Sequence, residues 1–333
     1  MLNMGVIGFG YWGPNVARNF NATDDAKVVS VCDKMPANLK RAGKIVPGAL
    51  TTQDSSDILD SPDIDAVAVV TPVSMHFELA RRALTNGKHV FVEKPFTATV
   101  AQARELIDLA EKKKLLIMVD HTFIFTGAVR KIKEVITEHE LGEIYYYDST
   151  RVNLGLFQHD VNVIWDLAPH DFSIMLHVLK DKPVAVAATG AKHVNDMVNV
   201  AYVTVFFEKA TIAHFNVNWL SPVKIRNTLI GGSKRMLMWN DVLADDKIKI
   251  YDKGIDVRST QSIVNLRINY RTGDMWAPRI DGKEALALEC EHFVDCIKTG
   301  RKPVNDGHAG LGVVQLLEAC DKSLEQDGKI VKL

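Results

Sequence analysis

The sequence predicts an α/β amino-terminal domain with a doubly wound parallel sheet, followed by an α+β domain with a large, mostly antiparallel sheet. Short apolar runs alternate with helical patterns as far as Asp120, and such unbroken runs are typical of parallel strands covered by helices on both faces. After a bridging helix near 127–138, strand-like runs follow one another with short polar turns, which favours antiparallel pairing. We therefore expect domains at 1–122 and 123–333.

The elements follow in this order along the chain. In the first domain, the strands are expected at 4–7, 28–31, 66–70, 90–92 and 115–119. In the second, they are expected at 144–152, 184–190, 198–207, 211–217, 226–230 and 235–239. Helices are expected at 284–299 and 309–326, and the poorly periodic stretch 251–281 is expected to be a long loop or tail.

The composition excludes several classes of protein. The 333 residues are 47% hydrophobic and 24% charged with a formal net charge of -1, so a strong positive field for nucleic acid is absent. No apolar stretch reaches the roughly 20 residues of a membrane span, and no leader is expected. The four cysteines are Cys32, Cys290, Cys296 and Cys320. They show neither a C-x-x-C pair nor the spacing of a zinc site, which favours a reducing cytoplasm and the absence of a metal.

A glycine-rich fingerprint follows directly on the first apolar strand and opens a helical pattern. Gly8 allows the tight turn, Gly10 allows close approach to a pyrophosphate, and Gly13 allows contact between helix and strand. The start of the helix offers unpaired N–H groups to phosphates. The sequence therefore predicts a Rossmann dinucleotide site at Gly8, Phe9, Gly10, Tyr11, Trp12 and Gly13.

The second strand ends at Asp33, whose carboxylate is placed to accept hydrogen bonds from the adenosine ribose and to repel a 2'-phosphate. This favours NAD over NADP. The neighbouring Lys34 is a second cofactor candidate and offers a cation to such a phosphate.

Polar residues also follow the later strands of the parallel sheet. Glu93-Lys94-Pro95 ends one strand and Thr71-Pro72, followed by His76, ends its neighbour, at the edge where open α/β sheets bind ligands. His121 follows the next strand and is expected near the nicotinamide. Solvated loop residues, or a structural histidine, are the alternative interpretation of this pattern.

Asp166 and His170 are four residues apart at the start of a helical pattern, with Pro169 expected in its permissive first turn. Residues at this spacing share a helix face, and a histidine titrates near neutrality, so the pair suits proton removal from an alcohol. A structural hydrogen-bond donor is the alternative for His170. Arg151 and Asn153 leave a strand near the expected cleft and are candidates for substrate binding, although outward-facing strand residues are the simpler interpretation.

These three motifs, at 8–13, at 93–95 and at Asp166 with His170, resemble the Gfo/Idh/MocA oxidoreductase family over nearly the whole chain. The resemblance implies that Lys94 contacts the reacting hydroxyl and the nicotinamide ribose, and that His170 is the acid/base. It also implies that Asp166 binds substrate or assists His170, and that Glu93 supports Lys94 and the cofactor. A cis bond between Lys94 and Pro95 is often found in the family.

Within that family, the stretches 10–15, 160–171 and 289–293 resemble nucleotide-sugar 3-dehydrogenases, which oxidise UDP-N-acetylglucosamine or its uronic acid. The chain differs from this pattern at Leu156 and Gln158, where such relatives tend to have a basic residue. The alternatives are a dehydrogenase of free cyclitols or sugars, a keto-sugar reductase, and a non-catalytic nucleotide sensor. Fold analogy implies a homodimer or homotetramer.

Overall fold

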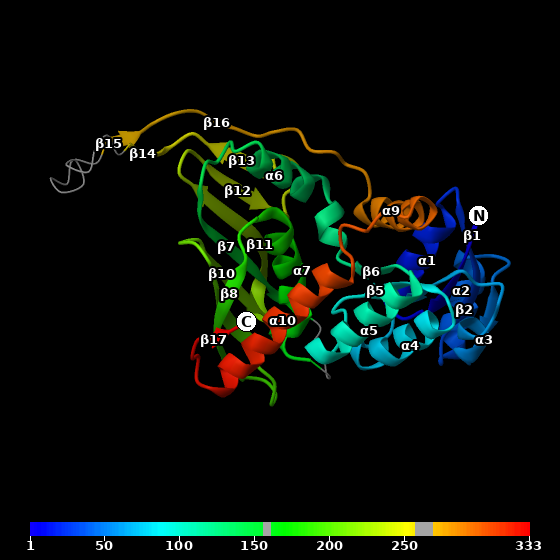
Figure 1. Cartoon of the computed structure of the whole chain (residues 1–333). Helices are drawn as coiled ribbons and strands as arrows, with labels where there is room; N and C mark the ends of the chain where they lie inside the picture. Colours follow the sequence, from blue (N-terminus) through cyan, green and yellow to red (C-terminus); the bar gives the residue numbers. More distant parts are fainter. Residues whose placement is uncertain (156–160, 257–268) are drawn as a thin grey trace. The chain divides into compact units, whose positions relative to one another are not determined.

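The computed structural model describes residues 1–155, 161–256 and 269–333 (Figure 1). The chain divides into two compact units, which are described separately. The first unit comprises Met1–Thr126 with Lys283–Gln315, and the second comprises Gly127–Gly282 with Leu316–Leu333. Within the described ranges, no helix combines the length and the apolarity that crossing a membrane requires.

The first unit contains a six-stranded parallel sheet in the order β3-β2-β1-β4-β5-β6, which confirms the predicted Rossmann domain. β4 in the middle of the sheet and β6 at its edge are buried along their whole length, as their unbroken apolar runs indicated. The short edge strand β3 was not predicted, because its three residues carry no apolar run. The strands are β1 (Leu2–Ile7), β2 (Ala26–Cys32), β3 (Leu50–Thr52), β4 (Ala66–Val69), β5 (His89–Glu93) and β6 (Ile117–Asp120).

The helices of the first unit include one from late in the chain. Phe293 of that helix, α9, makes edge-to-face contacts with Phe20 and Phe91, at 5.8 Å between ring centroids in both pairs. These contacts fix α9 against α1 and β5. The helices are α1 (Gly13–Asn21), α2 (Pro36–Ile45), α3 (Ser56–Leu59), α4 (Val73–Thr85), α5 (Val100–Lys113), the 3-10 helix η1 (Thr122–Phe125) and α9 (Ala285–Thr299).

The second unit contains a nine-stranded sheet in the order β16-β13-β12-β11-β7-β10-β9-β8-β17. Every pairing in it is antiparallel except β7 with β10, so the prediction of a mostly antiparallel sheet is confirmed. The strands are β7 (Ile144–Leu154), β8 (Pro183–Ala191), β9 (Val200–Phe207), β10 (Ile212–Asn218), β11 (Leu220–Gly232), β12 (Met236–Asn240), β13 (Ile248–Tyr251), β16 (Met275–Trp276) and β17 (Val331–Lys332).

The stretch 251–281, expected to be a loop or tail, contains short strands, so that expectation is wrong for part of it. β14 (Gly254–Asp256) pairs with β15 (Asn269–Arg271), and β16 pairs with β13. Strands of two or three residues are too short to show a period of two in the sequence.

Two helices of the second unit are α6 (Gly127–Thr137) and α7 (Val163–Val178). α7 packs on β7, β9 and β10, and the ring of Phe172 meets that of Phe215 edge to face at 4.9 Å. The last helix, α10 (Gly307–Glu325), contains the division between the two units, which falls after Gln315.

Candidate active site

The three fingerprint glycines differ in what surrounds them in the structure. Gly8 has a φ of +97°, and a Cβ on it would lie 2.2 Å from the Val70 carbonyl oxygen. A Cβ on Gly13 would lie 2.3 Å from the Gly8 carbonyl oxygen. A Cβ on Gly10 would meet no described atom within 4 Å. A side chain at Gly8 or Gly13 would therefore clash with the backbone of the protein. Gly10 borders open space that suits the pyrophosphate of NAD.

Asp33 holds this loop in place. Its Oδ2 accepts a hydrogen bond from the backbone N–H of Phe9 at 2.6 Å. Its Oδ1 accepts hydrogen bonds from Met35 N–H at 2.8 Å and from Asn38 Nδ2 at 3.0 Å. The second lone pair of Oδ2 remains for a ribose hydroxyl, so these bonds leave the predicted contact possible. The neighbouring Lys34 is exposed.

Arg41 is a site residue that the sequence did not reveal. From α2, its guanidinium donates to the carbonyl oxygens of Phe9, at 2.5 Å, and of Gly10. The same guanidinium lies 5.7 Å from the centre of the Phe9 ring. In the sequence Arg41 is one of several basic residues in an ordinary helical pattern, so only the tertiary contact distinguishes it. Tyr11, by contrast, is 88% exposed and points its ring to solvent.

The loops that follow β4 and β5 are joined by His76. Its Nε2 lies 2.7 Å from the Thr71 carbonyl oxygen and its Nδ1 lies 2.9 Å from the Pro95 carbonyl oxygen. Burial lowers the pKa of this imidazole. His76 therefore bridges the two loops through both of its ring nitrogens. The adjacent Thr71 hydroxyl is buried and has no hydrogen-bond partner among the described residues.

Glu93 and Lys94 lie at the carboxyl end of β5, and the Lys94 N–H donates to Glu93 Oε2. The bond between Lys94 and Pro95 is cis, as the family resemblance implied. On the next strand, His121 is 1% exposed, and neither of its ring nitrogens has a partner among the described residues. Burial, and secondarily the Lys94 charge, lower the pKa of His121 to about 3, so its ring is neutral near pH 7.

These orphaned polar groups at the sheet edge suit a bound nicotinamide. The Thr71 hydroxyl and the His121 imidazole follow β4 and β6, and both are buried without satisfied hydrogen bonds. A buried polar group without a hydrogen bond destabilises the protein unless a ligand supplies the missing partner. With the open space at Gly10, they show that the first unit fits a dinucleotide along the carboxyl edge of its sheet.

Asp166 and His170 both lie on α7, which begins before Asp166 and not, as was predicted, at Asp166 itself. The helix begins at Val163, because the Asn162 side chain accepts hydrogen bonds from Ile164 N–H at 3.0 Å and Trp165 N–H at 3.2 Å. Pro169 is therefore inside the helix and not in its first turn, and the backbone loses one hydrogen bond there. Asp166 remains in the first turn, with His170 one turn later on the same face.

Two further contacts hold the predicted pair. Trp219, which the sequence analysis did not identify, donates from Nε1 to Asp166 Oδ2 at 2.9 Å. Ser173 donates its hydroxyl proton to the His170 carbonyl oxygen at 2.8 Å. Trp219 is fully buried and lies 53 residues away in sequence, so no local pattern connects it with Asp166. Both members of the pair are partly exposed.

Arg151, a predicted substrate residue, is buried in an ion pair. Its Nε and Nη2 donate to the two carboxylate oxygens of Asp171 at 2.7 and 3.0 Å, and both side chains are 4% exposed. The pair ties β7 to α7 beside His170. Asn153 lies two residues further along β7 and is partly exposed.

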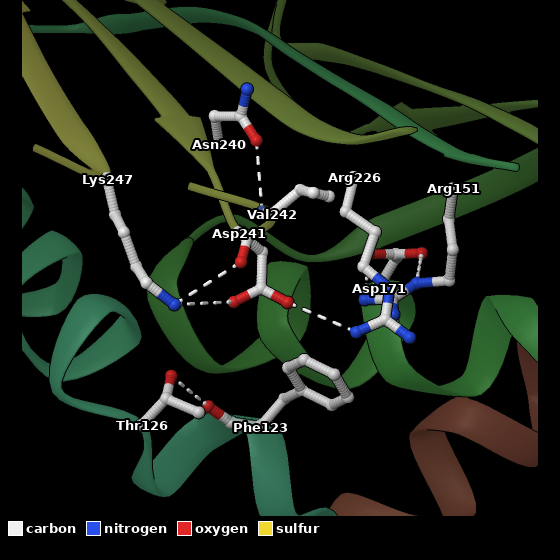
Figure 2. A network of polar contacts seen from close by, with 9 residues as sticks. All are labelled: Phe123, Thr126, Arg151, Asp171, Arg226, Asn240, Asp241, Val242 and Lys247. Carbon is white, nitrogen blue, oxygen red and sulfur yellow. Dashed lines mark hydrogen bonds and ion pairs between the residues drawn. The ribbon is translucent and has the colours of Figure 1, made fainter. Parts of the chain in front are cut away.

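A wider charged network extends from this pair across the sheet (Figure 2). Arg226 on β11 is the direct register partner of Arg151 on β7. Its guanidinium lies 3.2 Å from Asp241 Oδ2, and Lys247 Nζ lies 3.8 Å from Asp241 Oδ1. With Asp171, the group has three cations and two carboxylates. Arg226 and Lys247 are 30% and 28% exposed, so both cations are partly open to solvent.

The predicted residues thus fall into two sets. Those assigned to the cofactor, together with Lys94, follow the strands of the first unit, whereas the remaining candidates lie on β7 and α7 of the second. Asp160, which begins one of the stretches that resemble nucleotide-sugar 3-dehydrogenases, lies outside the described residues. So do Leu156 and Gln158, where the chain differs from that pattern.

Two family models match the chain. Residues 2–121 match the Gfo/Idh/MocA model described as an oxidoreductase family with an NAD-binding Rossmann fold. Residues 129–238 match the Gfo/Idh/MocA C-terminal domain.

Individual relatives agree with these models. The chain is 26% identical to a UDP-N-acetylglucosamine 3-dehydrogenase of Acidithiobacillus ferrooxidans, over 94% of both chains. It is 25% identical to an inositol 2-dehydrogenase of Rhizobium meliloti, over 99% of this chain and 98% of the relative. A solved structure of the A. ferrooxidans enzyme matches with a TM-score of 0.80 and 24% identity over 98% of each chain. The chain therefore belongs to the Gfo/Idh/MocA oxidoreductase family and is an NAD-dependent dehydrogenase.

Proposed function

We propose that the chain transfers hydride between NAD and a secondary alcohol of a sugar, and that this alcohol is the 3-hydroxyl of a UDP-N-acetyl-hexosamine or its uronic acid. The observation that carries the proposal is the placement of His170 one turn after Asp166 on α7, in a family member whose β5 is followed directly by Lys94. This is an acid/base pair and a cation of the kind that alcohol oxidation requires.

The first unit would hold the cofactor along the edge of its sheet. The pyrophosphate is assigned to the loop 8–13, the adenosine ribose to Asp33, and the nicotinamide to the neighbourhood of Thr71, Lys94 and His121. NAD is favoured over NADP, because the Asp33 carboxylate repels a 2'-phosphate. When bound, NAD supplies a two-electron hydride acceptor.

Residues of the chain would accept the hydroxyl proton and stabilise the negative charge on the alcohol oxygen. His170 Nε2 or Nδ1 takes the hydroxyl proton, and Asp166, held by Trp219, orients the substrate or the imidazole. The Lys94 ammonium stabilises the negative charge that develops on the alcohol oxygen. Glu93 supports Lys94 through its bond to the backbone N–H.

The substrate assignment is supported by the charged network and by the relatives. The partly exposed guanidinium of Arg226 and ammonium of Lys247 favour an anionic substrate, such as a diphosphate or a carboxylate. The A. ferrooxidans relative is named for a UDP-sugar. A dehydrogenase of free cyclitols is the alternative, and the R. meliloti relative favours it.

We also propose that the protein forms a homodimer or homotetramer through the nine-stranded sheet. Tyr146 and Ile212 are register partners on adjacent strands and are 36% and 42% exposed, and Tyr202 is 46% exposed. Light scattering coupled to gel filtration tests this proposal, and a monomer would contradict it. The four unpaired cysteines support a reducing cytoplasm as the compartment.

The test is a substrate panel. Purified protein with NAD receives UDP-N-acetylglucosamine, its uronic acid, myo-inositol or glucose, and the absorbance of reduced nicotinamide is followed. A rise with UDP-sugars alone supports the proposal, whereas a rise with inositol or glucose favours the free-sugar alternative. Bound cofactor without turnover of any substrate, in either direction, would identify a sensor.

A further inference from the structure

Trp12, the last residue before α1, is hydrogen-bonded to the end of β6, an edge strand of the parallel sheet. Its indole Nε1 donates to Asp120 Oδ2 at 2.8 Å, across 108 residues of sequence. Asp120 ends β6 and is 2% exposed, and its other oxygen accepts the hydroxyl proton of Thr122. The start of the fingerprint helix therefore depends on the geometry of one buried carboxylate.

A second carboxyl group, from a distant part of the chain, contacts the first. Glu289 on α9 is fully buried, and its carboxyl group lies beside that of Asp120. Its Oε1 accepts a hydrogen bond from Asn305 Nδ2 at 2.8 Å, and the same amide donates to the Val119 carbonyl oxygen at 2.6 Å. Phe293, one turn later on α9, anchors the helix between Phe20 and Phe91. Glu289 is thus held firmly against the end of β6.

A hydrogen bond between these two carboxyl groups requires that one of them carries a proton. Glu289 Oε2 is buried and accepts no hydrogen bond from an N–H or O–H group of the described residues. The Thr122 hydroxyl also lies near Glu289, but its single proton is donated to Asp120. Two ionised carboxylates in contact would repel each other strongly in a buried site. One of the two must therefore be a carboxylic acid.

The surrounding charges place that proton on Glu289. Burial and the charges of Asp120 and Glu93 raise the pKa of Glu289 well above its usual value. Burial also raises the pKa of Asp120, but its two accepted hydrogen bonds and the Lys94 charge favour its ionised form. The Cys290 thiol, next to Glu289 on α9, has a raised pKa because of burial and is neutral. Burial lowers the pKa of His121, next to Asp120, to about 3, so this imidazole is neutral as well.

We propose that Glu289 is a positioning residue for the cofactor: as a carboxylic acid it donates its proton to Asp120, and Asp120 thereby fixes Trp12 at the start of α1. The proposal rests on the assignment of the NAD pyrophosphate to the loop 8–13. A group whose pKa is raised in the folded protein keeps its proton at low pH and loses it as the pH rises through that folded value. When Glu289 loses its proton, the hydrogen bond that holds Asp120 is lost. NAD affinity should therefore weaken at alkaline pH.

The first experiment measures the dissociation constant of NAD by calorimetry from about pH 6 to about pH 9. Glu289→Gln keeps a donor toward Asp120 and an acceptor toward Asn305, so it should bind NAD like the wild type near neutrality and lose the alkaline weakening. Glu289→Ala and Trp12→Phe should weaken NAD binding about tenfold at every pH, the usual effect of losing one hydrogen bond to a charged group.

The second experiment measures the thermal midpoint of the same variants without cofactor. Wild-type folding must keep a proton on Glu289, which becomes harder as the pH rises, whereas a glutamine needs none. Glu289→Gln should therefore raise the midpoint, by more at higher pH. The matched control is Glu291→Gln on the same helix, whose side chain is 46% exposed and pairs with Lys283, and it should show no such trend.

The outcomes separate the proposal from the cofactor assignment. If Glu289→Gln weakens NAD binding as much as Glu289→Ala, or lowers the thermal midpoint, Glu289 acts as an anion and the proposal is overturned. Gly10→Ala tests the loop alone, because its Cβ has space in the protein but would meet the pyrophosphate. Unchanged NAD affinity in Gly10→Ala would overturn the cofactor assignment, and with it the positioning role. The thermal experiment would still decide where the proton is.

Discussion

The indole N–H of Trp219 donates to Asp166 Oδ2 across 2.9 Å, and so joins the residue between β10 and β11 to the first turn of α7. Trp219→Phe keeps the buried ring but removes this donor. We expect kcat to fall about tenfold with little change in stability, because one hydrogen bond to a carboxylate is lost.

The control for Trp219 is another buried tryptophan. The indole N–H of Trp239 has no hydrogen-bond partner among the described residues, so Trp239→Phe breaks no hydrogen bond among them. Steady-state kinetics should show an effect for Trp219→Phe alone. Equal losses in the two variants would mean that Trp219 acts only through packing.

Lys94→Ala should lower kcat by about 100-fold to 1000-fold, which is the typical loss when one preorganised charge near a developing oxyanion is removed. The dissociation constant of NAD should change little, since the fingerprint loop is untouched. Lys113→Ala, which removes an exposed surface cation, is the control for general charge effects. A Lys94→Ala enzyme with a near-normal rate would refute the assigned role.

His170→Ala should flatten the pH profile of alcohol oxidation and lower the rate by about 100-fold or more, because proton removal loses its base. In the wild type the rate should fall at acid pH as the imidazole becomes charged. His214→Ala, on β10 and 42% exposed, should keep the wild-type profile. If the His170→Ala profile keeps its shape, the base is another group.

His121 should make the protein less stable in acid. Its folded pKa is about 3, whereas an unfolded histidine has a pKa near 6.5, so the unfolded chain binds the extra proton between these values. Stability should fall with decreasing pH across this window by about 1.4 kcal/mol per unit for this group. Urea unfolding of His121→Gln should show a shallower dependence, and the exposed His308→Gln should not.

The buried Arg151–Asp171 pair should be strongly coupled. Either Arg151→Ala or Asp171→Ala leaves a buried charge without its partner and should lower the free energy of unfolding by about 3–5 kcal/mol. The double change Arg151→Met with Asp171→Leu should recover most of this loss, and urea unfolding measures it. A double variant no better than the singles would contradict the coupling. The exposed Arg81–Glu78 pair is the control, and its removal should leave stability nearly unchanged.

The glycine-rich loop and Asp33 could be predicted, because the signals for them lie within short stretches of the sequence. Gly8 and Gly13 are needed by backbone geometry within a few residues, and Asp33 ends a strand whose apolar run is plain in the sequence. The predicted start of α7 lies too late in the chain, because a proline at 169 is typical of a first turn. The Asn162 cap is the stronger signal, since its side chain satisfies two backbone N–H groups.

The remaining features depend on tertiary contacts that no local period records. Arg41 looks like any surface cation of a helix until its bonds to the fingerprint carbonyls are seen. Trp219 and Glu289 act on partners 53 and 169 residues away in the sequence. One rule would have directed attention to Asp120: it ends β6 at the register of Glu93, where acidic strand ends of a parallel sheet meet.

The return of α9 to the first unit has a consequence for how the protein is made. Phe20 and Phe91 leave the ribosome early, but the third ring of their cluster, Phe293, is synthesised only when nearly nine-tenths of the chain exists. Closing so long a loop is entropically costly and slow. The nascent amino-terminal half therefore exposes an unfinished apolar surface during translation, and chaperones that recognise such surfaces should associate with it until α9 emerges.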